Sequence, residues 1–195
     1  MTNFAERLHT HLTARPPGTI AEWEARPAAV LIPLFQEAGQ WHVLLTERTH
    51  LVEDHKGPVA FPGGRVDGQD ADRVATALRE AEEEVGLKPE HVAVLGQIDE
   101  LLTVSQYRIT PVVGVFPWPY TFTLQKTELS EVFTVPLRWL ADPANLEVQQ
   151  RHPLIPGRPV DVYYFYYAGH TIWGVTGRII VNLLEIIRPL LAAGA

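Results

Sequence analysis

The segment DADRVATALREAEEEVGL, residues 70–87, constrains the fold of this chain more than any other. It is rich in residues that favour a helix, has acidic residues at its start, and ends at Gly86, a residue common just past helix ends. Its apolar residues recur at intervals of three and four, and they are Val74, Ala77, Leu78, Ala81 and Val85. This spacing predicts an amphipathic helix with one stripe packed on a core.

The same segment places four glutamates within five positions, at Glu80, Glu82, Glu83 and Glu84. Like charges three or four residues apart on a helix repel by about a few tenths of a kcal/mol per pair. Because each helical residue is turned by about 100° from the last, the carboxylates of Glu80, Glu83 and Glu84 share a face and Glu82 points elsewhere. Such a face suits Mg²⁺ or Mn²⁺, whose binding would remove the repulsion. An ordinary solvated acidic face is the alternative.

A glycine-rich turn, AFPGG at residues 60–64, immediately precedes this segment. Its backbone can approach a ligand closely, so that a carbonyl can bind a hard cation and amides can bind phosphate. Arg79 lies four residues before Glu83 and is placed to orient it by an ion pair. A loop and helix of this kind favour metal-assisted attack of water on a phosphorus atom.

The rest of the chain mixes strand-like segments with a few helices, which predicts a single α/β (α+β) domain with a mixed sheet over residues 1–195. We expect an N-terminal helix at about 3–15, the loop and helix at about 62–87, a short helical piece at 136–143 and a C-terminal helix at about 173–192. The strand-like segments are 28–35, 41–48, 92–98, 108–116, 131–137, 146–150 and 160–168.

Composition excludes several classes of protein. The chain has no cysteine, so disulfides and zinc–thiolate sites are absent, and its histidines do not cluster at metal-ligand spacing. A net charge of −7 argues against a nucleic-acid partner, which needs a basic surface. No long apolar run predicts a secretory signal or a membrane span, so we expect a cytoplasmic protein without a membrane partner.

The run REAEEEVGL, residues 79–87, is similar to the end of the Nudix box, R-E-U-x-E-E-x-G-U, in which U is aliphatic. It matches at Arg79, Glu80, Ala81, Glu83, Glu84, Gly86 and Leu87. Counting from Gly64, the acidic position in the first half of the box falls on Asp70. Eight residues, rather than the seven of the box, then separate Asp70 from Arg79.

A second run, LLTERTHLVEDHKGPVAFPGG at residues 44–64, resembles the motif of the coenzyme A pyrophosphatase branch, L-L-T-x-R-[SA]-x3-R-x3-G-x3-F-P-G-G. It matches at Leu44, Leu45, Thr46, Arg48, Gly57, Phe61, Pro62, Gly63 and Gly64. Thr49 replaces the small residue, and Glu53 stands where the motif has arginine. The resemblance extends over roughly residues 28–187.

The resemblance implies an α/β/α sandwich and hydrolysis of coenzyme A, or of its acyl and oxidised forms, to 3′,5′-ADP and 4′-phosphopantetheine with Mg²⁺ or Mn²⁺. Another Nudix substrate, such as ADP-ribose or a nucleoside triphosphate, is an alternative. A module that binds a nucleotide without turnover is a third possibility. Whether the chain forms a homodimer stays open.

By the same resemblance, Glu80, Glu83 and Glu84 are metal ligands, the Gly64 carbonyl is a further ligand, and Arg79 holds a glutamate in place. Many Nudix enzymes use one more glutamate outside the helix. Glu131 is the preferred candidate for that ligand or general base; the other candidates are Glu80, Glu128, Asp99 and Glu100. The groups expected to contact substrate surround the glycine-rich turn: Arg48, His55, Lys56, Gly63, Gly64 and Arg65. The aromatic run at 162–167 is interpreted as packing rather than as a platform for adenine.

Overall fold

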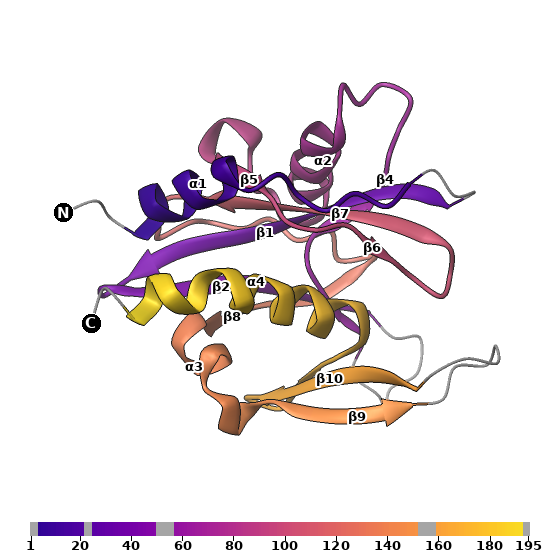
Figure 1. Ribbon diagram of the computed structural model, residues 1–195. Helices are drawn as coiled ribbons and strands as arrows, with labels where there is room; N and C mark the ends of the chain where they lie inside the picture. Colours follow the sequence, from indigo (N-terminus) through magenta and orange to yellow (C-terminus); the bar gives the residue numbers. More distant parts are fainter. Residues whose placement is uncertain (1–3, 22–24, 50–56, 152–158, 193–195) are drawn as a thin grey trace.

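The computed structural model describes residues 4–21, 25–49, 57–151 and 159–192 (Figure 1). An eight-stranded sheet forms its centre. The strands of this sheet are β1 (Arg26–Glu37), β2 (Gln40–Arg48), β3 (Val59–Ala60), β4 (Gly63–Arg65), β5 (Ala93–Gln97), β6 (Leu101–Leu102), β7 (Tyr107–Val115) and β8 (Leu129–Pro136). A separate three-stranded sheet contains β9 (Glu147–Arg151), β10 (Val160–Tyr167) and β11 (His170–Ile172).

The central sheet is mixed, as the sequence predicts. β1 pairs in parallel with β7, whereas its pairings with β2 and β4 are antiparallel. β2 pairs along its length with β8, and β5 and β6 both pair with β7. The turn between β1 and β2 contains Ala38 and Gly39, both at positive φ, which suits a tight hairpin.

Helices cover both faces of the central sheet, so the expected α/β/α sandwich is confirmed (Figure 1). The helices are α1 (Phe4–Ala14), α2 (Arg73–Val85), α3 (Leu137–Ala141) and α4 (Gly174–Ala192), with short 3₁₀ turns η1 (Pro89–His91) and η2 (Pro143–Asn145). α2 packs on one face through a cluster that includes Leu44, and α1 and α4 pack on the other through a cluster that includes Leu45. Neighbouring residues of β2 therefore point to opposite layers.

Two local expectations need correction. The glycine-rich segment after Pro62, expected to be a loop, contains the short strand β4, because its backbone pairs with β1. The helix begins at Arg73 rather than near residue 70, so the acidic residues expected in its first turn precede it. Asp72 is its N-cap.

The aromatic run of β10 divides between core and surface. Phe165 is completely buried and Tyr164 is 6% exposed, whereas Tyr166 is 53% exposed. Packing is therefore the main role of this run, as expected. In the part of the chain that the structure describes, no helix is both long enough and apolar enough to cross a membrane.

Candidate active site

The ends of α2 are set by its caps. The Asp72 side chain accepts a hydrogen bond from the Ala75 N–H at 2.8 Å. At the other end Gly86 has φ 72°, and its N–H donates to the Glu82 carbonyl. The stripe between the caps is buried, with Ala77 and other apolar residues against the sheet. Glu82 and Glu83 lie on the exposed side of α2, whereas Glu84 is buried beside the glycine-rich segment.

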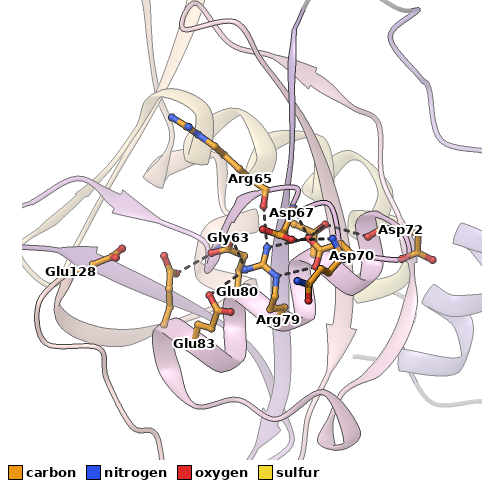
Figure 2. Close-up of polar contacts among 12 residues, drawn as sticks. Gly63, Arg65, Asp67, Asp70, Asp72, Arg79, Glu80, Glu83 and Glu128 are labelled. Atoms are coloured by element: carbon orange, nitrogen blue, oxygen red, sulfur yellow. Dashed lines mark hydrogen bonds and ion pairs between the residues drawn. The ribbon is translucent and has the colours of Figure 1, made fainter.

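Arg79 is the centre of a polar network that joins the loop before α2 to the glutamates on it (Figure 2). Its Nε and Nη2 donate to the two oxygens of Asp70 at 2.9 and 3.1 Å, and Nη2 also donates to the Arg65 carbonyl at 3.0 Å. Its Nη1 lies 3.0 Å from Glu80 Oε1 and 3.1 Å from Glu83 Oε2. The ion pair between Arg79 and Glu83 expected from their spacing is present, and the same guanidinium also holds Glu80.

Asp70 is the buried partner that orients Arg79. Its side chain is 5% exposed and also accepts from Thr76 Oγ1 and from the Asp67 N–H, each at 2.8 Å. The hydrogen bonds from Arg79 hold the pKa of the Asp70 carboxyl well below its usual range. Eight residues, one more than in the Nudix box, separate Asp70 from Arg79, and Asp70 still binds the arginine.

Glu84 is a buried carboxylate whose negative charge has two weak polar partners among the described residues. Its Oε2 accepts from the Gly63 N–H at 3.3 Å, and Arg48 Nη2 lies 3.8 Å from its Oε1. Burial, with a contribution from the neighbouring Glu80 charge, raises the pKa of Glu84 to about 7. Burial also raises the pKa of Glu80. Two carboxylates that are costly to ionise side by side form a place where a cation is favourable.

The glycines before α2 let the loop lie against these carboxylates. A Cβ on Gly64 would lie 2.5 Å from the Glu80 carboxylate, and one on Gly63 would lie 2.5 Å from the Ala29 carbonyl oxygen. A Cβ on Gly57 would lie 1.5 Å from the Arg48 carbonyl oxygen. Side chains at these three positions would force the loop away from β1, β2 and α2.

Many residues of the 44–64 run have structural roles. Leu44 and Leu45 are completely buried in the two different core clusters. Thr46 Oγ1 donates to the Ala60 carbonyl at 3.1 Å, which links β2 to β3. Among the described residues of this run, 44–49 and 57–64, Arg48 is the one whose charged group reaches a carboxylate of the site.

Arg48 also links the site to the segment before β8. Its Nη2 is 2.8 Å from Glu128 Oε2, and the Thr49 N–H donates to the Glu128 carbonyl at 2.8 Å. Glu128 is close enough to Glu84 to contribute to its raised pKa. Arg65 is exposed and donates from Nε to Tyr107 Oη at 2.8 Å. The expected substrate contacts His55 and Lys56 lie outside the described residues.

Glu131 lies apart from the glutamates with which the sequence grouped it. It is directly opposite Glu47 across the β2–β8 pair, and its carboxylate faces His170 of β11. Arg48, the next residue of β2, faces Glu84 instead. His170 stacks on Phe133, which packs against the core cluster of α4, so Glu131 belongs to the side of the sheet that α4 covers.

The other two candidate bases, Asp99 and Glu100, hold the N-terminal segment. Asp99 is 2.5 Å from Arg15 Nη2 and accepts from the Gly18 N–H, and the Arg15 hydrogen bond lowers its pKa. Glu100 accepts from the Ile20 N–H at 2.9 Å. Of the four candidates outside α2, only Glu128 is tied to the glutamates of the helix.

The sequence alone left the role of Asp70 unassigned and gave no sign of the contact between Glu47 and His170. Asp70 could have been found from the acidic position of the box, which it occupies with one extra residue. Glu47 and His170 are 123 positions apart, and their pairing depends on where β11 packs. No local spacing encodes that contact.

Comparison with known proteins identifies the family. Residues 25–156 match the NUDIX domain. The Nudix hydrolase NudL of Photorhabdus laumondii is 36% identical over 191 residues, covering 96% of this chain and 98% of that protein, and is described there as uncharacterized. NudL of Klebsiella pneumoniae, described in the same way, is 40% identical over 184 residues, 93% of each chain.

Among solved structures, the Nudix hydrolase RenU of M. smegmatis superposes with a TM-score of 0.50 at 25% identity, covering 62% of this chain and 76% of that one. The chain belongs to the Nudix family. It is a Nudix hydrolase, a pyrophosphohydrolase of nucleoside diphosphate derivatives. Enzymes of this family use divalent metals.

Proposed function

We propose that this Nudix hydrolase cleaves the pyrophosphate of coenzyme A and of its acyl and oxidised forms, releasing 3′,5′-ADP and the matching 4′-phosphopantetheine. The observation that carries the proposal is the contact between the 44–64 run and α2. Gly63 donates to Glu84, and Arg48 lies 3.8 Å from it. Two residues of the run that resembles the coenzyme A motif therefore contact a carboxylate of α2.

The donor set fits Mg²⁺ or Mn²⁺, since it offers carboxylate oxygens and a loop carbonyl. We assign Glu80, Glu83 and Glu84 as ligands, with the Gly64 carbonyl as a further candidate. The raised pKa values of Glu80 and Glu84 support this assignment, because burial makes the ionised carboxylates costly and a bound cation would offset that cost. When bound, the cation supplies positive charge to the pyrophosphate oxygens and lowers the pKa of the attacking water.

The protein's own residues position the metal ligands and the substrate phosphates. Arg79, held by Asp70, fixes the rotamers of Glu80 and Glu83. Arg48 forms an ion pair with Glu84, and we assign it to a substrate phosphate, to which a guanidinium can bind in a bidentate manner. Arg65 and the glycine-rich turn extend the same surface, and His55 and Lys56 stay proposed contacts.

In the reaction, the water oxygen bonds to one phosphorus, the bridging oxygen leaves with its electron pair, and a base takes the water proton. We place this base at Glu128 rather than Glu131, because Glu128 is 2.8 Å from Arg48 and Glu131 is on the other face of the sheet. Glu128→Gln is expected to lower kcat by about 10²-fold or more. A larger loss of kcat in Glu131→Gln, measured in parallel, would reverse the assignment.

The substrate is tested by measuring kcat/KM for coenzyme A, acetyl-coenzyme A, ADP-ribose and a nucleoside triphosphate with Mg²⁺ and with Mn²⁺. The coenzyme A forms are expected to give the highest values, and Glu84→Gln should abolish turnover of all of them. Preference for ADP-ribose would retain the Nudix chemistry and overturn the coenzyme A assignment. Tight nucleotide binding with no turnover of any compound would identify a binding module.

A further inference from the structure

We propose that Glu131 and His170 bind a second divalent cation, of the first transition series, on the face of the sheet opposite α2, with Glu47 orienting the histidine. Within the described ranges 4–21, 25–49, 57–151 and 159–192, one group of three His, Asp or Glu side chains has a ligand atom on each within 4.8 Å of the others. That group is Glu47, Glu131 and His170. It is independent of the function proposed above.

One ring nitrogen of His170 is hydrogen-bonded to Glu47, and the other faces Glu131. His170 Nδ1 lies 2.6 Å from Glu47 Oε2, and both residues are 5% exposed. An ionised carboxylate only accepts hydrogen bonds, so the Glu47 contact favours the tautomer with the proton on Nδ1, which leaves the lone pair on Nε2 for a cation. A carboxylate behind the imidazole is the common outer-shell arrangement of histidines that bind metals.

The ring cannot easily turn away from this orientation. It stacks on Phe133 of β8 with centroids 3.8 Å apart and an interplanar angle of 4°. This stacking and the Glu47 hydrogen bond direct His170 Nε2 towards Glu131. A ligand on a fixed ring binds a cation with less loss of side-chain entropy.

The gap between Nε2 and Glu131 fits an ion better than a hydrogen bond. The Nε2 to Oε2 distance is 4.0 Å, too long for a hydrogen bond. Tetrahedral zinc with bonds of about 2.0–2.2 Å holds two ligand atoms about 3.4 Å apart, so the half-exposed Glu131 carboxylate has to move towards His170 by about 0.6 Å to bind the same ion. An imidazole with carboxylates suits Zn²⁺ or a neighbouring transition metal better than Mg²⁺, which prefers oxygen ligands.

The pairing of β2 with β8 gives a second reason to expect a cation, because it places two glutamates opposite each other. Glu47 and Glu131 are direct cross-strand partners, and like charges in that position destabilise a sheet. Glu47 is buried, so its charge is poorly screened by solvent. A bound cation would offset this repulsion and tie β2, β8 and β11 together.

Zinc binding tests the proposal. The full untagged chain carrying Glu80→Gln and Glu84→Gln, which disable the α2 site, is freed of metal and titrated calorimetrically with Zn²⁺ in excess Mg²⁺. One Zn²⁺ per chain is expected, with affinity reduced at least about tenfold by a further Glu131→Gln. Glu147→Gln, at another exposed strand glutamate, is the control and should leave binding unchanged. No binding in the parent variant, or equal binding after Glu131→Gln, would overturn the proposal.

A residue-specific measurement distinguishes zinc bound at His170 from zinc bound elsewhere on the chain. In long-range ¹H–¹⁵N spectra of the same parent variant, Zn²⁺ should shift the Nε2 resonance of His170 and leave its Nδ1 protonated. His170→Gln identifies that resonance, and Glu131→Gln, which changes a half-exposed side chain, should suppress the shift in a chain that still folds. Shifts confined to other histidines would contradict the site.

Discussion

Glu84→Gln separates the cost of the buried carboxylate from its role with a metal. In the metal-free protein, burial raises the pKa of Glu84 from 4.5 to about 7. The folded state therefore binds this proton more tightly than the unfolded state. Stability from this group is complete below about pH 4.5 and is lost as the pH rises through about 7. At about 1.4 kcal/mol per pKa unit, the loss at pH 8 is about 3 kcal/mol.

A neutral glutamine avoids this loss and keeps an oxygen for the Gly63 N–H. Metal-free Glu84→Gln is therefore expected to be more stable than the wild type at pH 8 by up to about 3 kcal/mol, or roughly 6–12 °C in Tm for a chain of this size. The difference should shrink to near zero at pH 4. Glu82→Gln, at an exposed position on the same helix, should show neither effect.

The assay is urea unfolding with EDTA at pH 4, 6 and 8, repeated at pH 8 with saturating Mg²⁺ or Mn²⁺. The cation should stabilise the wild type more than the variant, because it binds the ionised carboxylate. The reasoning is refuted if metal-free Glu84→Gln is less stable than the wild type at pH 8, or if the difference between them does not depend on pH.

Three further outcomes follow from the same geometry. Asp70→Asn, which breaks the forked contact with Arg79, should destabilise the protein by about 2 kcal/mol at pH 7 in urea unfolding. Because the pKa of Asp70 is lowered, this difference should narrow as the pH falls below about 4. Gly64→Ala should weaken Mn²⁺ binding in an EPR titration at least about tenfold by displacing Glu80, whereas Gly68→Ala, with no atom within 4 Å of the added Cβ, should not. Removing metal with EDTA should abolish turnover, and Mg²⁺ or Mn²⁺ should restore it.

The parts of this protein that follow from local pattern were predictable. The periodicity of α2, its end at Gly86 and the pairing of Arg79 with Glu83 depend on residues within one or two turns of each other. The longer strands of the central sheet, β1, β2, β5, β7 and β8, likewise coincide with predicted apolar, β-branched segments. Short strands such as β4 were missed, because glycine carries no strand preference and its pairing with β1 is a long-range contact.

The placement of Glu131 shows what local pattern cannot supply. A glutamate near the start of a strand can face either side of a sheet, and a shift of one residue reverses the choice. Its face depends on the register of β8 against β2, which joins residues more than eighty positions apart. Glu128, three residues earlier, reaches the α2 side because Arg48 binds it there.

The most direct test of the proposed function is hydrolysis of coenzyme A in H₂¹⁸O with Mg²⁺ or Mn²⁺, followed by mass spectrometry of the products. We predict 3′,5′-ADP and 4′-phosphopantetheine, with a single ¹⁸O atom in one of the two and no products when EDTA is present. Intact coenzyme A under conditions in which the same preparation cleaves ADP-ribose would contradict the account.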